Sequence, residues 1–522
     1  MKDKKSLILA ALSYLVLAAA CSEGPADNET VKEDDTPTGE TPTEVTHADN
    51  YEAKCYLRDV YMVHDSKNLK EFTGYYYWTD EIKEAALGLD LDEYDIYTCF
   101  DKMLNNPTDR WSWMVDAESY LENESGEYKG IWGVSFSQAV DDYDDYSLHV
   151  IQVFPSSPFA RYGVTRGAKL LKMGDLDISD GFKTQSEIDY YNNHIYDSPQ
   201  TFSMRLVDGR DTTFTIELPY SLSFNYITAS KVFTQDDYPG LTKPVGYLCY
   251  DQFEANFVSD LDTAFARFKD AGVKKLILDL RYNGGGNSVA SDRLISYLAP
   301  SGLVGKPYVT RTHNSYLSSN DETSYIGLQS GRSYSDISIG LEDIYFIMTR
   351  SSASASEMVY NGLRPYMTEG VNLHLVGEQS YGKPNGMYVL FYPGTNAAYA
   401  RYDKGDYSKL EWVFYPICFY NKNANGQTIP AGSTSGTGFV PEKEYPDDIY
   451  HDFGPEEENI GACLRHIVSG EFPDAYWNTS RGSSTKATSP GIINRALLPE
   501  ADTNPRYGRC VVRKKTSEGT SE

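Results

Sequence analysis

Short apolar runs alternate with segments of helical spacing across the second half of the chain. Residues 344–348 form a compact apolar run with β-branched and aromatic members, which is typical of a buried strand, and 358–367 carry apolar residues at roughly helical spacing. Upstream, 246–250 and 274–280 predict two further strands, and 258–268 between them predicts a helix with one apolar face. Strands that alternate with helices in this way predict an α/β core.

Two regions of different character precede this core, which we expect to occupy residues 221–475. Residues 50–127 are rich in aromatic side chains and predict a helical domain. We interpret the Tyr and Trp clusters as packing, although a substrate groove or a carbohydrate-binding surface would use the same residue types. Residues 128–220 contain strand-like runs such as 150–154, which predict a β-rich domain.

The two ends of the chain lack the pattern of a folded domain. Residues 1–20 begin with lysines and continue with an apolar core that is too short to span a membrane, as in a targeting signal. The segment L-A-A-A-C that ends at Cys21 resembles a bacterial lipoprotein signal, in which this cysteine is lipidated. A secretory signal with an A-x-A cleavage site is the alternative. Residues 21–49 predict an acidic tether and 476–522 a polar tail, because neither has enough apolar residues for a core.

The composition narrows the possible partners. The chain has 522 residues, of which 40% are hydrophobic, and this is enough for several folded domains. Its formal net charge of −28 argues against a nucleic-acid partner, because phosphate binding depends on clusters of Lys and Arg. No C-x-x-C or H-E-x-x-H pattern occurs, so we expect no metal site and no cofactor. A disulfide between Cys55 and Cys99 is conceivable, whereas Cys249 and Cys418 are expected to be buried thiols.

One serine stands where the strand at 344–348 gives way to the next helix. Ser354 follows several small residues, and the free amides of a helix N-terminus beside it would hold an oxyanion. Ser354 and Glu357 also form the S-x-x-E pattern of a helix capping box, which on its own is the simpler interpretation. Lys383 lies in a turn, where a lysine ordinarily points into solvent. The glycines at 284–286 allow backbone amides to approach an anion closely.

Together these motifs resemble the C-terminal processing peptidases, also called tail-specific proteases. The matching segments are D-L-R-Y-N-G-G-G at 279–286, S-A-S-A-S-E at 352–357, and V-G-E at 376–378 followed by the Gly-Lys pair at 382–383. The resemblance covers roughly residues 50–475. It implies an α/β catalytic core of the ClpP/crotonase-like type, a helical N-terminal cap and a PDZ-like domain.

The resemblance also assigns roles within these motifs. It implies that Ser354 is the nucleophile and Lys383 the general base, and that the amides of Ala355 and Gly286 form the oxyanion hole. One position departs from the pattern, because Met387 stands where the family often has glutamine. The glycine-rich segment does not fit a dinucleotide-binding fingerprint or a P-loop, since neither the third glycine nor a Gly-Lys-Ser/Thr sequence follows it.

The β-rich region begins with the loop and strand G-I-W-G-V-S-F at 130–136, and by this segment it resembles a PDZ domain. The resemblance implies that a loop and strand bind the carboxylate of a peptide through the following residues: Gly130, Ile131, Trp132, Gly133 and Val134. In such a domain a peptide adds as a strand to a sheet edge, and its terminal carboxylate meets loop amides. Ala168 stands where the family pattern has an acid, and a generic β-hairpin domain is the alternative.

We therefore expect a multidomain serine endopeptidase that cleaves extracytoplasmic proteins recognised through their C-terminal tails. Its substrates are proteins or peptides, and its only attachment to a membrane is a lipid at Cys21. The expected location is the cell envelope, anchored to the outer membrane and facing the periplasm or the cell surface. Because of Met387, a catalytically weak or inactive peptide-binding lipoprotein remains the alternative.

Overall fold

The computed structural model describes residues 50–58, 75–104, 109, 111–125, 127–128, 131–138, 147–219, 221–315, 317–327, 338–367, 369–394, 396–431 and 438–474. The chain divides into two compact units: Met1–Tyr120, Thr312–Asp321 and Asn385–Tyr420 form the first, and Leu121–Arg311, Glu322–Pro384 and Asn421–Glu522 form the second. The predicted signal, the tether with Cys21, the polar tail and Gly130 lie outside the described residues.

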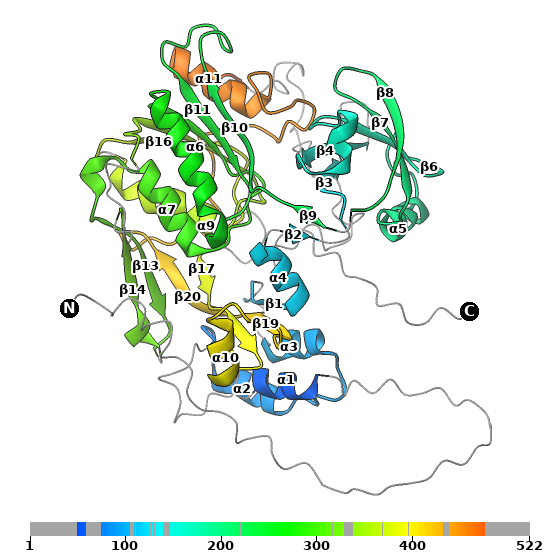
Figure 1. The fold of residues 1–522 in the computed structure, drawn as a ribbon. Coiled ribbons are helices and arrows are strands. Elements are labelled where there is room, and N and C mark those ends of the chain that lie inside the picture. Colours follow the sequence, from blue (N-terminus) through cyan, green and yellow to red (C-terminus); the bar gives the residue numbers. More distant parts are fainter. Residues whose placement is uncertain are drawn as a thin grey trace, which may run out of the picture. The chain divides into compact units, whose positions relative to one another are not determined.

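A six-stranded sheet organises the second unit (Figure 1). The strands lie in the order β10, β11, β12, β15, β16, β21, and every pairing is parallel except that of β10 with β11. Their bounds are β10 Ile227–Phe233, β11 Val245–Tyr250, β12 Lys275–Asp279, β15 Asp343–Met348, β16 Asn372–Gly377 and β21 Lys443–Glu444. Parallel strands need crossover connections, which helices supply, so the predicted α/β class is confirmed.

Helices pack on both faces of this sheet. They are α6 Val258–Asp270, α7 Ser288–Leu298 and α9 Ala355–Leu363 on one face and α11 Glu458–Ser469 on the other. Side chains alternate along a strand, so Leu276 and Leu278 of β12 join the cluster of the first three helices, while Ile277 joins that of α11. Burial on both faces makes the central strands a rigid support for the loops that follow them.

A smaller sheet lies between residues 134 and 216 of the same unit. Its strands follow the order β3, β4, β5, β7, β8, with β6 paired to β5. Their bounds are β3 Val134–Gln138, β4 Leu148–Val153, β5 Lys169–Met173, β6 Leu176–Asp177, β7 Gln200–Arg205 and β8 Asp211–Ile216. Helix α5 (Gln185–His194) begins with a capping box of Thr184 and Glu187. This sheet has its own hydrophobic cluster around Phe159 and Phe202.

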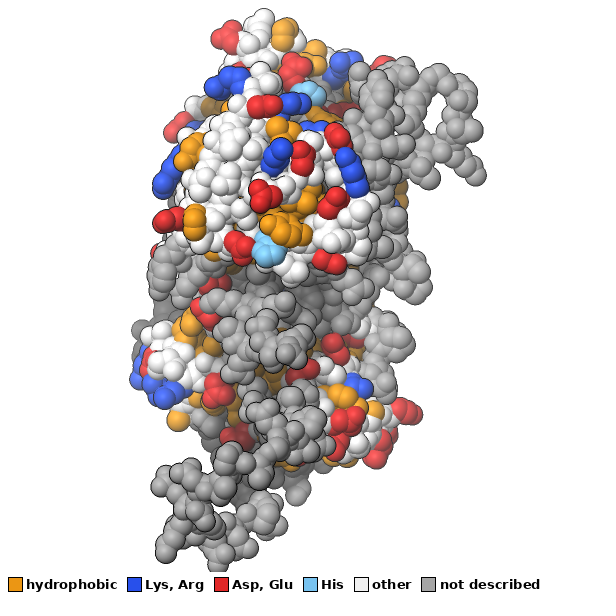
Figure 2. Space-filling view, turned by 90° about the vertical axis from the view of Figure 1, so that its right-hand side faces the viewer, with side chains coloured by type: hydrophobic (Ala, Val, Ile, Leu, Met, Phe, Trp, Pro, Cys, Tyr) orange, Lys and Arg blue, Asp and Glu red, His pale blue; other side chains and the backbone are white. Residues whose placement is uncertain are grey.

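Charged side chains of both signs are spread over the surface turned toward the viewer in Figure 2. In the smaller sheet, Arg205 pairs with Asp211 at 2.8 Å and Lys172 with Asp177 at 3.0 Å, and all four side chains are about half exposed. Exposed pairs of this kind contribute little to stability because water screens them. These two ion pairs therefore add little to the stability of this sheet.

The first unit combines helices with a small sheet. Its helices are α1 Tyr51–Tyr56, α2 Asp80–Leu87, α3 Ile96–Leu104 and α10 Asn396–Tyr402. Strand β19 (Trp412–Tyr415) lies between β1 (Trp113–Asp116) and β18 (Leu390–Tyr392), and both pairings are antiparallel. The sequence predicted only helices for residues 50–127, because the partners of β1 lie about 300 residues away in the chain.

Shorter elements complete the described structure. They are α4 Ala117–Ser125, β2 Glu127–Tyr128, β9 Leu222–Ser223, β13 Pro307–His313, β14 Glu322–Tyr325, β17 Asn385–Met387, β20 Ile417–Lys422, and the 3-10 helices η3 Pro158–Tyr162, η4 Ala255–Phe257, η5 Ser301–Leu303, η6 Ser318–Asn320 and η7 Arg364–Tyr366. None of the helices in the described ranges is long and apolar enough to span a bilayer. Cys55 and Cys99 are both buried thiols and are not joined by the disulfide considered between them, and Cys249 and Cys418 are buried thiols as predicted.

Candidate active site

Three loops leave the same edge of the large sheet. They follow the C-terminal ends of β12, β15 and β16, which are neighbouring parallel strands. Backbone hydrogen bonds join the loops directly after the strands end. The N–H of Leu280 donates to Ile347 O at 2.9 Å, and the N–H of Glu378 donates to Met348 O at 2.8 Å. The three motifs that the sequence singled out are therefore adjacent in the fold, as is usual for sites of parallel sheets.

Ser354 has an unusual backbone conformation at the start of α9. Its φ is 56° and its ψ −113°, and it is one of two non-glycine residues with positive φ in the described part of the chain. Such a conformation costs energy and persists only when the surroundings fix it. The fixing contacts come from Asn283, whose carbonyl accepts the N–H of Ala353 at 3.1 Å and the hydroxyl of Ser356 at 2.8 Å.

The glycine loop lies directly against this serine. A Cβ added to Gly285 would lie 2.7 Å from Ser354 Cβ and 3.0 Å from the nitrogen of Ala355, and one added to Gly286 would lie 2.1 Å from Phe253 O. Both glycines have positive φ, 110° and 130°. Only glycine fits this approach. The structure thus places Gly285, the neighbour of the predicted donor Gly286, against the nitrogen of Ala355, and the oxyanion role of Gly286 and Ala355 stays a prediction.

Hydrogen bonds of two buried side chains hold the glycine loop in place. Asn283 is completely buried; its Oδ1 accepts the N–H of Gly285 at 2.9 Å, and its Nδ2 donates to Tyr250 O at 2.9 Å. Ser352, equally buried, donates from its hydroxyl to Leu280 O at 2.7 Å. Sequence analysis assigned no role to Asn283 or Ser352, although both lie inside the recognised motifs.

Glu357 connects the serine to the lysine loop. Its carboxylate is completely buried and accepts four hydrogen bonds: from Ser354 N at 3.1 Å, Ser380 Oγ at 2.6 Å, Gly382 N at 2.7 Å and Lys383 N at 2.9 Å. Burial raises its pKa, and these hydrogen bonds oppose the rise. The capping interpretation was therefore correct for the Ser354 N–H but incomplete, because three of the four donors lie on the loop after β16.

The backbone of Lys383 is fixed by a hydrogen bond. The residue is half-buried, and its N–H is bonded to Glu357 in the loop that leaves β16. The predicted pair of Ser354 and Lys383 thus shares one anchoring carboxylate. Transfer of a proton between the two side chains remains a prediction.

A buried charge network supports the glycine loop from its other side. Arg281, with a completely buried side chain, contacts Asp279 at 2.7 Å, Asp447 at 2.8 Å and Glu457 at 2.6 Å. Arg166, from the segment between β4 and β5, reaches the same Asp447 at 2.7 Å. Burial would raise the pKa of Asp447, but the charges of Arg166 and Arg281 outweigh it and hold this pKa below its ordinary value. The network thereby joins the small sheet to the residues that precede Gly285.

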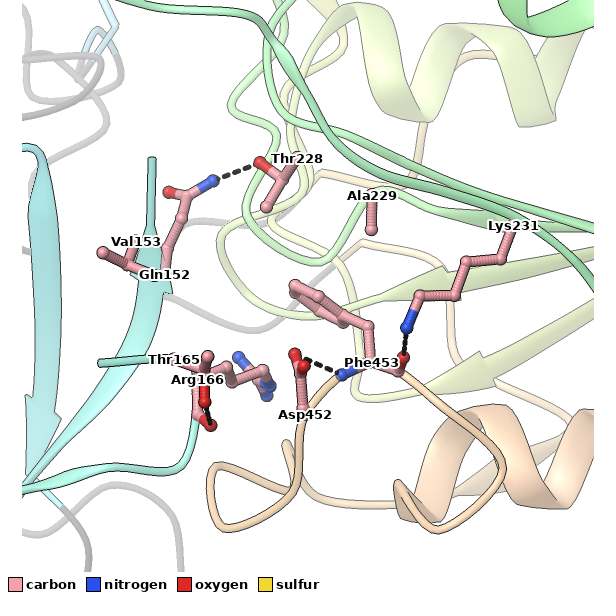
Figure 3. A pocket seen from close by; sticks show the side chains of 9 residues that line it. All are labelled: Gln152, Val153, Thr165, Arg166, Thr228, Ala229, Lys231, Asp452 and Phe453. Atoms are coloured by element: carbon pink, nitrogen blue, oxygen red, sulfur yellow. Dashed lines mark hydrogen bonds between the residues drawn. The ribbon is translucent and has the colours of Figure 1, made fainter. Parts of the chain in front are cut away.

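A hollow of about 260 Å³ lies beside this network (Figure 3). Its lining comes from the small sheet, from β10 and from the loop before α11: Gln152, Val153, Thr165, Arg166, Thr228, Ala229, Lys231, Asp452 and Phe453. The amide of Gln152 donates to Thr228 Oγ1 at 2.7 Å across it. None of the lining residues belongs to the three motifs around Ser354, so we do not place the active site there.

The proposed peptide-binding residues have mixed surroundings. Trp132 is 2% exposed, and its indole Nε1 donates to Ile195 O at 2.6 Å, so its ring packs inside the small domain. Gly133 has a φ of 65° and its carbonyl accepts the N–H of Phe154 at 3.0 Å. Ile131 is half-buried, and Val134 begins β3 at the end of the strand order. The side chain of Trp132 is thus committed to packing, and peptide binding by this loop stays a prediction.

The two histidines that could act as the general base in place of Lys383 have other partners. His313 lies between Asp321 Oδ1 at 3.1 Å and the hydroxyl of Tyr388 at 2.8 Å. His374 lies near the start of β16, at the opposite strand end from Ser354, and contacts Glu442 at 3.3 Å. Within the described ranges, no group of three His, Cys, Asp or Glu side chains could hold a metal ion.

Comparison with known proteins agrees with this geometry. Residues 244–407, which include Ser354, Lys383 and the glycine loop, match the model of peptidase family S41. A putative S41 protease from Bacteroides fragilis superposes with a TM-score of 0.56 at 20% identity, over 76% of this chain and 95% of that one, which shows a shared fold.

Two other solved structures are less similar. The photosystem II D1 C-terminal processing protease gives a TM-score of 0.40 at 15% identity, over 77% of this chain and 93% of that one. A putative peptidase from Parabacteroides merdae gives 0.33 at 16% identity, over 77% and 90%. Residues 244–407, which carry the strained serine on its parallel sheet, are thus similar to the serine-type peptidases of family S41.

Proposed function

We propose that this protein is an endopeptidase in which Ser354 and Lys383 act as a catalytic dyad. The observation that carries the proposal is Glu357, which binds the backbone N–H of both residues with one oxygen, at 3.1 and 2.9 Å. A shared anchor of this kind fixes the two backbones relative to each other. Fixed geometry is a prerequisite for efficient proton transfer between side chains.

The chemistry follows the acyl-enzyme route. The neutral amine of Lys383 takes the proton of the Ser354 hydroxyl as Oγ attacks the scissile carbonyl, and the amide nitrogen of the substrate leaves with a proton in the next step. The Ala355 and Gly286 amides bind the oxyanion, and each such donor lowers the barrier by about 3 kcal/mol. An ordinary lysine pKa is about 10.4, so the mechanism requires a site that favours the neutral amine.

We further propose that substrates are selected by their C-terminal tails. Support comes from β3, which ends the strand order of the small sheet and has no second strand partner among the described residues. Extended peptides bind such edges by adding a strand. The loop formed by Gly130, Ile131, Trp132, Gly133 and Val134 would then meet the terminal carboxylate with backbone amides.

The location of the enzyme is also a proposal. Cys21 follows a short apolar segment and precedes an acidic tether, which supports lipid attachment there and placement in the cell envelope. On this basis the targets are extracytoplasmic proteins. Replacement of Cys21 by Ala is expected to release soluble protein or leave an unprocessed precursor. Unchanged processing and membrane fractionation of that variant would disprove lipid anchoring.

One experiment tests the catalytic proposal directly. Purified protein is treated with a fluorophosphonate probe and, separately, with a denatured protein substrate. We expect labelling and cleavage that disappear in Ser354→Ala and persist in Ser351→Ala, an exposed serine of the same turn that serves as the matched control. Absence of both from the unaltered protein, with retained peptide binding, would instead favour the non-catalytic peptide-binding lipoprotein.

A further inference from the structure

The hollow beside the charge network has room for a small molecule (Figure 3). Its volume is about 260 Å³. A cavity of about 150 Å³ holds one benzene molecule, so a ligand of about ten non-hydrogen atoms fits here. Polar and apolar side chains share the lining, as is usual in sites for small molecules.

Two opposite charges in the lining have no ionic partner. Lys231 of β10 donates from Nζ to the carbonyl of Phe453, and Asp452, in the loop before α11, accepts the N–H of Phe453 at 2.8 Å. Over the described ranges neither side chain forms an ion pair, so the two are not paired with each other although both line the hollow. An ammonium group has three N–H bonds and a carboxylate has two acceptor oxygens, so both retain capacity for a ligand.

The second cation of the lining, Arg166, already has its partners. Its guanidinium contacts Asp447 at 2.7 Å and donates to Ile151 O at 2.7 Å and to Asp448 O at 2.8 Å. The charge of Arg166 is therefore balanced within the network. Lys231 is the cation of this lining that can serve a ligand.

Apolar surface separates the two unpaired charges. In Figure 3, Phe453 lies between Lys231 and Asp452, and Val153 and Ala229 line the same hollow. Contact with such surface favours a ligand that carries an aliphatic group. A molecule that reaches both charges would place its apolar part against this surface.

We propose that the hollow binds a free α-amino acid with an aliphatic side chain, of about the size of leucine. The carboxylate of the amino acid accepts hydrogen bonds from Lys231 Nζ, its ammonium group donates to Asp452, and its side chain contacts the apolar lining. Only a ligand with both charges gives a partner to both side chains, which favours a zwitterion over a simple acid or a simple amine. The site is separate from Ser354, so the inference does not depend on the proposed dyad.

The test measures thermal unfolding and calorimetric binding of L-leucine with the full-length protein. A ligand of this size is expected to bind with a Kd of about 1 mM, and the unfolding midpoint should rise as the leucine concentration exceeds that value. The acid 4-methylpentanoate lacks the ammonium group, and 3-methylbutylamine lacks the carboxylate. Each should bind about 10-fold more weakly than leucine, because one charge of the hollow stays unpaired.

Substitutions locate the binding in the hollow. Lys231→Met keeps the apolar stem but removes the charge, and Asp452→Asn keeps the shape of the side chain; each should weaken leucine binding by about 10-fold or more. Lys243→Met is the matched control, because Lys243 is exposed and lies outside the lining, and it should bind leucine as the unaltered protein does. The unfolding midpoint without leucine reports whether each variant folds. Asp452 is exposed, so its variant should fold even if Lys231→Met does not.

Three outcomes overturn the inference. The first is an unfolding midpoint that does not rise at about ten times the expected Kd. The second is equal binding of leucine and 4-methylpentanoate, which would make the hollow a site for simple carboxylates. The third is unchanged leucine affinity in a folded variant of Lys231 or Asp452, which would place the amino acid elsewhere. Binding is measured without turnover, so none of these results bears on the proposed peptidase activity.

Discussion

The backbone N–H groups of Ser354 and Lys383 donate to the same atom, Oε2 of Glu357, at 3.1 and 2.9 Å. One buried carboxylate therefore sets the separation of two loops that follow different strands. Its other oxygen accepts Ser380 Oγ and Gly382 N, at 2.6 and 2.7 Å, so every donor of the lysine loop that faces it is satisfied. Few side chains other than an ionised carboxylate accept four hydrogen bonds at once.

Replacement of Glu357 by Gln is the first prediction. An amide nitrogen can only donate, so it would face the N–H of Gly382 in the place of Oε1, or those of Ser354 and Lys383 in the place of Oε2, and push the loops apart. We expect kcat to fall about 100-fold, the effect of misplacing reacting groups by about 1 Å, and the free energy of unfolding to fall by about 2 kcal/mol. Steady-state kinetics and urea unfolding measure the two effects.

Glu187→Gln is the control for this change. Glu187 caps α5 in the same S/T-x-x-E pattern, where its Oε2 accepts the N–H of Thr184 at 3.1 Å, but no catalytic motif contains it. It should leave kcat unaltered. Equal kcat values in both variants would show that Glu357 is only a helix cap.

The glycine loop gives the second prediction. Gly286→Ala adds a Cβ that would lie 2.1 Å from Phe253 O, in a backbone conformation that alanine avoids. The loop must move, and loss of one oxyanion donor lowers kcat by about 10²- to 10³-fold. Gly284→Ala is the control, because a Cβ there has no atom within 4 Å. Similar kcat values for both alanine variants would show that the Gly286 amide is not an oxyanion donor.

The order of the motifs was enough to predict that their three segments lie close together, while their catalytic roles stay a prediction. Parallel strands place their C-terminal ends at one edge, so Ser354, Lys383 and the glycine segment had to converge once the α/β core was recognised. The second role of Glu357 could not be predicted in the same way, since S-x-x-E is satisfied locally. Its partners Ser380 and Gly382 become visible only when the loop after β16 is traced in space.

Contacts between distant segments account for most of what the sequence did not reveal. Asp447 meets Arg281 across 166 positions and Arg166 across 281, and no periodicity or motif spacing encodes such pairs. The pairing of β1 with β19 is of the same kind. The burial of the Trp132 side chain could not be predicted from the sequence either. Its motif suggested that it binds peptide, whereas in the structure it packs inside the small domain.

Asp447 gives the third prediction, on acid stability. Its pKa in the folded protein lies below the ordinary value of about 3.9, so its ionised form stabilises the fold above that pH, and this contribution is lost as the pH falls further. Asp447→Asn should lower the free energy of unfolding by about 3 kcal/mol at pH 7, because Arg166 and Arg281 lose a shared partner. The difference in the free energy of unfolding between this variant and the unaltered protein should become smaller below about pH 4.

Urea unfolding at pH 7, 5 and 3.5 measures this dependence. Asp211→Asn is the control, because Asp211 also pairs with an arginine but lies exposed on β8. It should change stability little at any of these pH values. If the free energies of unfolding of Asp447→Asn and the unaltered protein differed by the same amount at all three pH values, the assignment of the charge network would be contradicted.

Substrate choice is the subject of the fourth prediction. If the loop around Gly133 binds a terminal carboxylate, peptides with a free C-terminus are cleaved with a lower KM than the same peptides amidated there. Acetylation of the N-terminus removes the other terminal charge and is expected to have no effect, which makes it the matched control. Equal KM values for free-acid and amidated peptides would show that this domain does not select tails.

The last prediction concerns the base. Lys383→Ala should be inactive although folded, and Lys383→Arg should be nearly inactive because arginine keeps its proton at any workable pH. His313→Ala and His374→Ala should keep most activity, since His313 is bonded to Asp321 and Tyr388 and His374 lies at the far strand end.

A neutral amine is the active form in this mechanism, so kcat/KM should rise with pH until the lysine has lost its proton. A histidine base would give a rise centred near pH 6.5 that an alanine at one of the two positions abolishes. Substantial turnover by Lys383→Ala, together with loss of activity in either histidine variant, would replace the Ser/Lys dyad by a Ser/His arrangement. If Lys383→Ala alone loses activity and both histidine variants stay active, the lysine is the base.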